Sequence, residues 1–505
     1  MEFKENSGID GKNLRENNIA EGDISSGDAN ELFAELFQIV KTINANISNI
    51  SDENLLTLLV RAKQIIYYEP ELYDTNEKVI PDYFIQDLNS VLLFSQIAQH
   101  TNNSEIIENS LIILQGLIYY SPIALEVFIQ LDLKSLLMNY FIEMSKNGIQ
   151  GNIISTILGI ILKMSEDSNS HLEIDVIPLL FTFLENCEKQ NLNENASIGI
   201  QNAILIIFDI FGSFIRYNDK SVLAPFLGVF LNLKVFLQNI IYQKSLIQLL
   251  DDLAMKGFIS DIIRSSTYST CLELLNDSSY QDSYRFVIRL IIQILNLFVQ
   301  TEREGNESYE LTQDNLEICV PFKKIYRLLK KDENDENRND YLLLYEKISN
   351  IGGLRFLLTE INGENQPLLI KILENDSFLF KSRVFHFFWE GLFKLNSFDQ
   401  VFIMNSIIFT SMILRSVDFQ EEDDDVDLLL RFFAFFDHIL TIVPSNSNIR
   451  GINGRSSTND ENVQLKLNSE AYNSINQFVS DCIECDNEML TQAAIVFMSK
   501  YAINN

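Results

Sequence analysis

Apolar residues recur along this chain with the spacing of α-helices. The segment 105–122 reads "EIIENSLIILQGLIYYSP", and its residues at intervals of three and four form one stripe of a helix: Ile106, Ser110, Ile113, Leu117 and Tyr120. Further apolar residues widen this stripe, so most of the circumference is expected to be buried. Runs in which β-branched and polar residues alternate, as in strands, are almost absent. The pattern therefore predicts an all-α fold.

The same kind of helix end recurs along the chain. "IIYYEP" at 65–70 and "LIYYSP" at 117–122 each close an apolar helix with a polar corner. Pro122 cannot continue a helix but fits the first turn of the next one, and Ser121 can cap that turn. Looser copies, each an apolar turn followed by polar residues, begin at 160, 214, 252, 297, 347, 392, 440 and 496.

These helix ends resemble those of a known repeat family. "SLIILQGLIYYSP" (110–122), followed by the amphipathic "IALEVFIQLDLKSLLMNYF" (123–141), resembles the end of one armadillo repeat and the start of the next. The average step of about 48 residues is near that of armadillo and HEAT repeats. The resemblance covers most of 31–505 and implies a right-handed superhelical solenoid of about ten armadillo/HEAT-like repeats. A non-repetitive all-α bundle is the alternative.

Composition suggests where the repeat domain is interrupted. Residues 1–30 have few apolar anchors and are predicted to form a disordered acidic and polar tail. The repeat domain then covers 31–505. Residues 444–468 are rich in Ser, Asn and Gly and are predicted to be a disordered insertion. Within it, Ser457 and Thr458 each have an acidic residue three positions on, a pattern that acidophilic kinases favour and that also arises by chance.

Charge narrows the class of partner. Asp and Glu number 70 against 38 Lys and Arg, which gives a net charge of −32. A field of this sign repels nucleic-acid phosphates and anionic lipid headgroups. We therefore expect other proteins as partners, especially Lys/Arg-rich segments, and no nucleic acid. The alternative is that the acid only keeps an apolar chain soluble.

The sequence shows no disulfide pattern, signal peptide or uninterrupted membrane span. The five cysteines are scattered in no disulfide-like framework, and the N-terminal segment is too polar for a signal peptide. Apolar windows such as "NAILIIFDIFGSFI" (202–215) are interrupted, here by Asp209, and fall short of the roughly 20 apolar residues of a membrane span. We expect no membrane span and a reducing compartment, the cytoplasm or the nucleus.

Catalytic chemistry has few candidates. Cys482 and Cys485 form one CxxC without a second pair to complete a metal site, so two helix cysteines are the simpler interpretation. The four histidines do not pair at metal-ligand spacing, and no nucleophile or phosphate-binding motif occurs. We expect no metal, no cofactor and no enzyme. An enzyme whose site the sequence hides remains an alternative.

The resemblance to armadillo proteins implies a binding row. In that family the last helix of each repeat lines a concave surface, and an Asn near its end holds an extended peptide. The corresponding positions here are Gln64, Gly116, Gly159, Ser213, Asp251, Asn296, Glu346 and Gly391. Only Asn296 matches the family, and Trp389 is the sole tryptophan, so a role as a nuclear-import adaptor is in doubt.

The row offers acids where the family has Asn and Trp. The candidate partner-binding residues are Asp251, Asp252, Asn296, Glu346, Trp389 and Glu390. The expected function is a non-enzymatic scaffold or adaptor that binds proteins along a curved helical surface. The alternative is an acidic-groove transport or regulatory factor that recognises basic protein segments.

Overall fold

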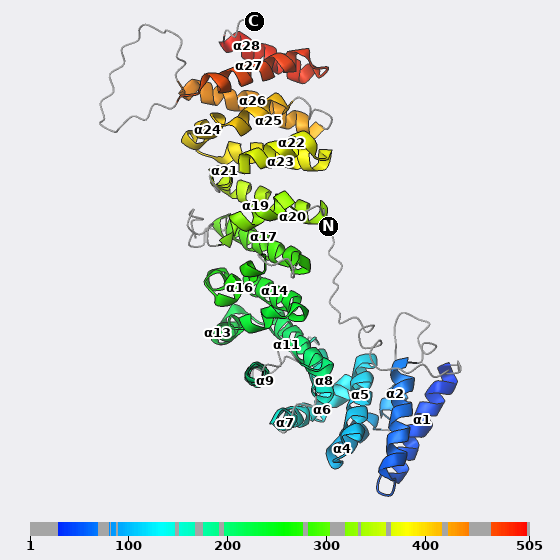
Figure 1. Ribbon diagram of the computed structural model, residues 1–505. Coiled ribbons are helices and arrows are strands. Elements are labelled where there is room, and N and C mark those ends of the chain that lie inside the picture. Colours follow the sequence, from blue (N-terminus) through cyan, green and yellow to red (C-terminus); the bar gives the residue numbers. More distant parts are fainter. Residues whose placement is uncertain are drawn as a thin grey trace. The chain divides into compact units, whose positions relative to one another are not determined.

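The computed structural model describes most of the chain in thirteen stretches. These are residues 29–68, 80, 82–86, 89–146, 151–166, 175–190, 196–275, 281–303, 319–331, 335–359, 365–416, 423–443 and 466–501. Within them every regular element is helical, which confirms the all-α class (Figure 1). The predicted tail lies outside the described residues except for 29 and 30, and so does the insertion except for 466–468. Ser457 and Thr458 also lie outside them.

The chain divides into two compact units, Met1–Phe214 and Ile215–Asn505, each described separately below. The helices of the first unit are α1 (Ala29–Asn46), α2 (Asp52–Tyr68), α3 (Asp82–Gln86), α4 (Ser90–His100), α5 (Ser104–Tyr120), α6 (Pro122–Gln130), α7 (Leu133–Lys146), α8 (Gly151–Glu166), α9 (Val176–Lys189) and most of α11 (Ile198–Tyr217). In this unit α2 packs against α1 and α5, and α5 packs in turn against α4 and α8.

The corner after α5 forms as the sequence predicts. α5 ends at Tyr120, and Pro122 occupies the first turn of α6. The hydroxyl of Ser121 accepts a hydrogen bond from the backbone N–H of Ala124 at 3.2 Å. The two helix axes differ by 118°, so this short cap turns the chain into a new helix.

The second unit begins with short helical segments and continues with longer helices. Its elements are α12 (Lys220–Leu223), η2 (Ala224–Phe226), α13 (Leu227–Phe230), η3 (Lys234–Gln238), α14 (Ile240–Met255), α15 (Ile259–Ile263), α16 (Ser266–Leu274), α17 (Gln281–Arg303), α19 (Phe322–Lys331), α20 (Asp335–Ile348), η5 (Ser349–Gly353), α21 (Leu354–Thr359), α22 (Asn365–Asn375), α23 (Phe378–Lys394), α24 (Ser397–Met404), α25 (Ile407–Leu414), α26 (Asp423–Ile442), α27 (Ser469–Glu484) and α28 (Glu488–Tyr501).

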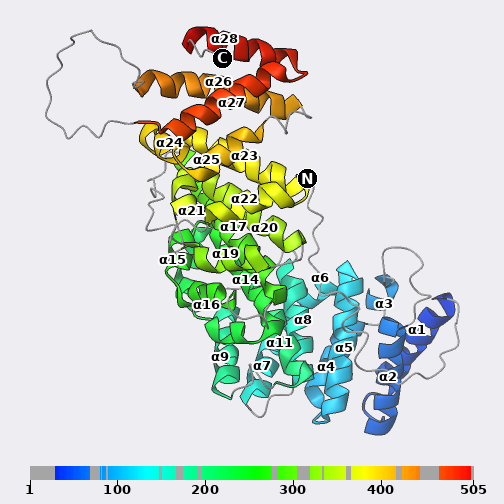
Figure 2. The same cartoon turned by 45° about the horizontal axis from the view of Figure 1, so that its top comes forward.

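Long helices of the second unit pack in chain order. α14 lies against α17, α17 against α20 and α20 against α23, while α28 packs on both α26 and α27 (Figures 1 and 2). Shorter helices pack beside this series, for example α22 against α23 and α25. Each long helix therefore buries its apolar stripe mainly against its neighbours in the chain.

α11 is longer than the apolar window that the sequence suggested. By length and composition this helix could cross a membrane, and so could two bent helix pairs if each is taken as one span, namely α5 with α6 and α24 with α25. The apolar stretch of α11 is therefore longer than the window 202–215 suggested, and the expectation of no membrane span stays a prediction. In this fold 72% of its most apolar stretch is buried inside the protein, so packing accounts for its composition.

Candidate interaction surface

The predicted row of positions lies on successive long helices. In the first unit Gln64, Gly116 and Gly159 lie on α2, α5 and α8. In the second unit the row follows α14, α17, α20 and α23, in the order Asp251, Asn296, Glu346 and Gly391. The sequence register of the row therefore matches the packing order within each unit.

The glycines of this row face neighbouring helices and not solvent. A Cβ on Gly116 would lie 2.4 Å from Cγ2 of Ile66 on α2. A Cβ on Gly391 would lie 1.8 Å from the Oγ of Ser349, whose hydroxyl donates to the backbone carbonyl of Phe387 at 2.7 Å. The expectation that this position lines an open surface is wrong at these glycines, because close helix contact requires the missing side chain.

Trp389 is likewise part of the core. Its exposed fraction is 0%, and its ring centroid lies 3.8 Å from that of Phe432 on α26. Phe385, Phe388 and Phe409 surround it within 6.4 Å, centroid to centroid. The prediction that Trp389 contacts a partner is therefore wrong, because aromatic rings from α23, α25 and α26 already cover it.

Three of the candidate acids already have cations on neighbouring helices. Asp252 lies 3.5 Å from the guanidinium of Arg216, and its side chain is 11% exposed. Glu346 lies 3.9 Å from Arg383, and Glu390 pairs with Arg431. These pairs connect helices within the second unit, so much of the negative charge of the row is neutralised internally.

Asp251 differs from these acids. Among the described residues it has no ion-pair partner, and one of its carboxylate oxygens is buried without a hydrogen bond. Burial, reinforced by the negative charge of Asp252, raises the pKa of Asp251 to about 6. Asn296, the one match to the armadillo position, is half-buried on α17. The row therefore presents little unpaired acid to a ligand.

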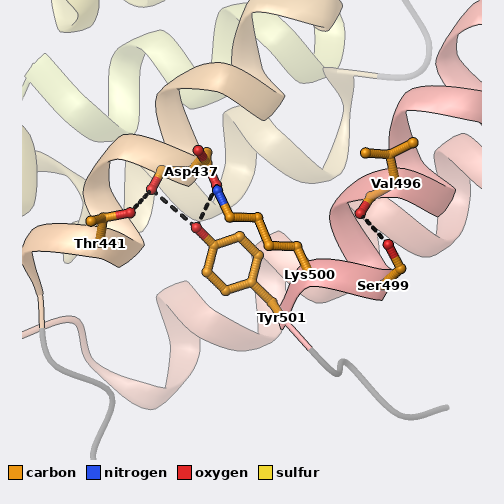
Figure 3. A network of polar contacts seen from close by, with 6 residues as sticks. All are labelled: Asp437, Thr441, Val496, Ser499, Lys500 and Tyr501. Atoms are coloured by element: carbon orange, nitrogen blue, oxygen red, sulfur yellow. Dashed lines mark hydrogen bonds and ion pairs between the residues drawn. The ribbon is translucent and has the colours of Figure 1, made fainter.

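A polar network joins the last helix to α26 (Figure 3). The carboxylate of Asp437 accepts hydrogen bonds from the Nζ of Lys500 and from the hydroxyl of Tyr501. The backbone carbonyl of Asp437 accepts two more, from the hydroxyl of Tyr501 at 3.1 Å and from that of Thr441 at 2.7 Å. The bonds from Lys500 and Tyr501 hold the pKa of Asp437 below its usual range. We call these contacts the C-terminal network; they attach α28 to α26.

Sequence reasoning missed an exposed aromatic pair on α24. Phe398 and Phe402 are 46% and 44% exposed. The guanidinium of Arg355, from α21, lies over both rings, 5.5 Å from the centroid of Phe398 and 4.6 Å from that of Phe402. The same guanidinium forms an ion pair with Asp399. We call Arg355, Phe398, Asp399 and Phe402 the α24 patch.

The α24 patch had one signal in the sequence. Asn396 caps α24 by accepting the N–H of Asp399 at 3.0 Å, so Phe398 and Phe402, four residues apart, must lie on one side of the helix. From the sequence alone, however, two phenylalanines at this spacing would more simply be assigned to the hydrophobic core.

The described residues contain no group of three or more His, Cys, Asp or Glu side chains that could hold a metal ion. Burial raises the pKa values of the Cys187, Cys271 and Cys319 thiols to about 12. The CxxC lies at the end of α27, where the Sγ of Cys485 is 3.1 Å from the backbone carbonyl of Cys482. Cys187, Cys271, Cys319 and Cys482 are thus buried packing residues, and Cys485 is half-buried.

Comparison with known proteins leaves the family open. No protein-family model matches this chain, and no curated protein matches it. The chain is similar to a crystal structure of an engineered protein, at 10% identity, over 93% of this chain and 100% of the other, with a TM-score of 0.48. A likeness at this level carries no argument about function.

Proposed function

We propose that this protein is a non-enzymatic scaffold or adaptor that binds other proteins on a surface of armadillo/HEAT-like helical repeats. The proposal includes a right-handed solenoid of about ten repeats and a location in the cytoplasm or the nucleus. Packing of the long helices in chain order supports it, because stacked repeats contact mainly their neighbours.

The α24 patch is the observation that carries the binding proposal. Aromatic residues and Arg are enriched where protein–protein binding energy concentrates. Phe398 and Phe402 are exposed and lie on one helix, while Arg355 contacts both rings and pairs with Asp399. Because these contacts already restrict Arg355 and the two rings, binding of an apolar partner surface should cost the patch less conformational entropy.

The alternative, an acidic groove for basic segments, has weaker support. The net charge of −32 and the unpaired carboxylate of Asp251 favour it. Internal pairing of Asp252, Glu346 and Glu390 opposes it, since a basic ligand would have to compete with arginines already in place. We therefore rank it second.

The test compares two variants in affinity capture from the native cell with quantitative mass spectrometry. Phe398→Ala with Phe402→Ala should reduce at least one reproducible partner tenfold or more, as expected from losing about 2 kcal/mol at a binding hot spot. Phe378→Ala, which removes a phenylalanine that is 48% exposed elsewhere in the same unit, should leave that partner in place.

Circular dichroism and thermal unfolding of both variants serve as the folding controls. Equal recovery of all partners with the folded double variant would contradict the assignment of the α24 patch. A measured turnover of a small substrate by the purified protein would contradict the non-enzymatic proposal.

A further inference from the structure

α19 is a basic helix in an acidic chain. Its sequence, "FKKIYRLLKK", carries five Lys or Arg residues in ten positions, while the whole chain has a net charge of −32. Charge of the opposite sign, concentrated on one helix, distinguishes α19 from its surroundings.

The apolar side of α19 is fixed in the core. Phe322, Ile325 and Leu329 are 4%, 0% and 2% exposed, and the ring of Phe322 lies 4.6 Å from that of Phe356. The helix therefore cannot turn its apolar face toward a membrane or a target groove while the unit is folded. Only its outer face is available.

That outer face carries a stripe of three cations. Lys323, Arg327 and Lys330 stand at i, i+4 and i+7, which places them on one side of the helix, and all three are exposed. We call them the α19 stripe. In the part of the chain that the structure describes, none of the three forms an ion pair with a carboxylate. Lys330 lies 3.4 Å from the hydroxyl of Tyr326 and 5.5 Å from the centroid of its ring.

Other cations of this region, by contrast, form hydrogen bonds or ion pairs within the fold. Lys324, on the same helix, donates to the backbone carbonyl of Leu272 at 2.9 Å. Arg285 and Arg289 on α17 both lie within 4 Å of Asp340, at 3.4 and 3.8 Å. The α19 stripe thus offers positive charge that no carboxylate of the described residues neutralises.

We propose that the α19 stripe is a docking site for a short acidic segment of a protein partner. The stripe extends over about 10 Å of helix, which suits a few successive carboxylates. A nucleic acid or an anionic membrane would bring extended negative charge close to the many acids of the chain, whereas a short segment would not. This surface lies apart in sequence from the α24 patch and does not depend on it.

The probe is a fluorescent peptide of twelve residues that alternates Glu and Asp, titrated by anisotropy against the full chain. Binding is expected at low salt and should weaken as salt shortens the screening length to about 10 Å at 0.1 M. Lys323→Gln, Arg327→Gln and Lys330→Gln together should weaken it at least tenfold.

A matched variant controls for net charge. Lys41→Gln, Lys234→Gln and Lys371→Gln remove three exposed cations from other helical segments and should leave the affinity within about twofold, because distant charges are screened. The Phe398→Ala, Phe402→Ala variant should also bind the peptide normally, which separates this inference from the proposed function.

The proposal would be overturned if the acidic peptide did not bind, if the parent and the stripe variant bound it equally, or if the matched variant lost as much affinity as the stripe variant. Stripe-dependent binding of duplex DNA or phosphatidylserine vesicles that is tighter than binding of the peptide would also overturn it. A change of oligomeric state in the stripe variant, measured by analytical ultracentrifugation, would also overturn it, since the occupant would then be a second copy.

Discussion

The fold opposes the ionisation of Asp251, since burial raises the pKa of this carboxyl; burial also raises the pKa of Asp252, although Arg216 partly offsets that rise. Asp251 lies on α14 beside Asp252, and among the described residues no cation pairs with it, whereas Asp252 has Arg216. An acid whose pKa is raised by folding binds its proton more tightly in the folded state. The resulting stability is present below its unfolded pKa and is lost as the pH rises through the folded value.

Asp251→Asn should therefore stabilise the protein at neutral pH. The pKa of Asp251 is raised from 3.8 to about 6, so the gain should grow between these two pH values, be complete above pH 6 and vanish below pH 4. We expect about 1 kcal/mol at pH 7.5, after allowance for partial exposure of the carboxylate.

Urea unfolding at pH 7.5 and pH 4 measures the gain. Asp261→Asn, at an exposed acid of α15, makes the same change in net charge and should have little effect at either pH. A stabilisation by Asp251→Asn that is equal at both pH values would contradict a role for ionisation.

At the scale of elements, the sequence predicted helix ends better than it predicted surfaces. The corner at Ser121 and Pro122 was predictable because capping and proline geometry act within a few residues. The burial of Trp389 was not, because it depends on Phe432, which is 43 positions away in a helix of unknown placement. The ion pair of Glu390 with Arg431 joins residues 41 positions apart and was hidden for the same reason.

The α24 patch is the opposite case to Trp389, because residues whose type suggests burial are exposed there. Phenylalanines are usually buried, so Phe398 and Phe402 gave no reason to expect exposure. Arg355 approaches them from α21, across 43 and 47 positions of sequence. Only the packing of α21 beside α24 brings the guanidinium over both rings.

The C-terminal network predicts how α28 is held. Tyr501→Phe removes a hydroxyl that donates to both the carboxylate and the carbonyl of Asp437. Amide hydrogen exchange in α28 should then become faster, while exchange in α14 stays the same, because local opening depends on local contacts.

Hydrogen-exchange mass spectrometry of the full chain measures this change. Ser499→Ala removes a hydroxyl that bonds only within α28, to the carbonyl of Val496 at 2.7 Å, and serves as the control. Unchanged exchange in α28 of the Tyr501→Phe protein would show that apolar packing alone holds the helix.

At the scale of the whole molecule, a number of acids are neutralised by ion pairs between helices, while positive charge gathers on α19. Several acids of the second unit are paired between helices, among them Asp340 with Arg285 and Glu374 with Arg415. The net charge of −32 is thus less available to ligands than the sequence alone suggests. The α19 stripe is a local region of positive charge. The net charge of the whole chain does not reveal it.

Packing in chain order is the central claim, and lysine cross-linking with mass spectrometry tests it most directly. The second unit carries lysines from Lys220 to Lys500. If its helices stack as repeats, links within this unit should join lysines less than about 100 residues apart, or two repeats of armadillo or HEAT length. Frequent links between the region of Lys220 to Lys256 and the region of Lys466 to Lys500 in a monomeric sample would indicate a closed bundle and contradict the account.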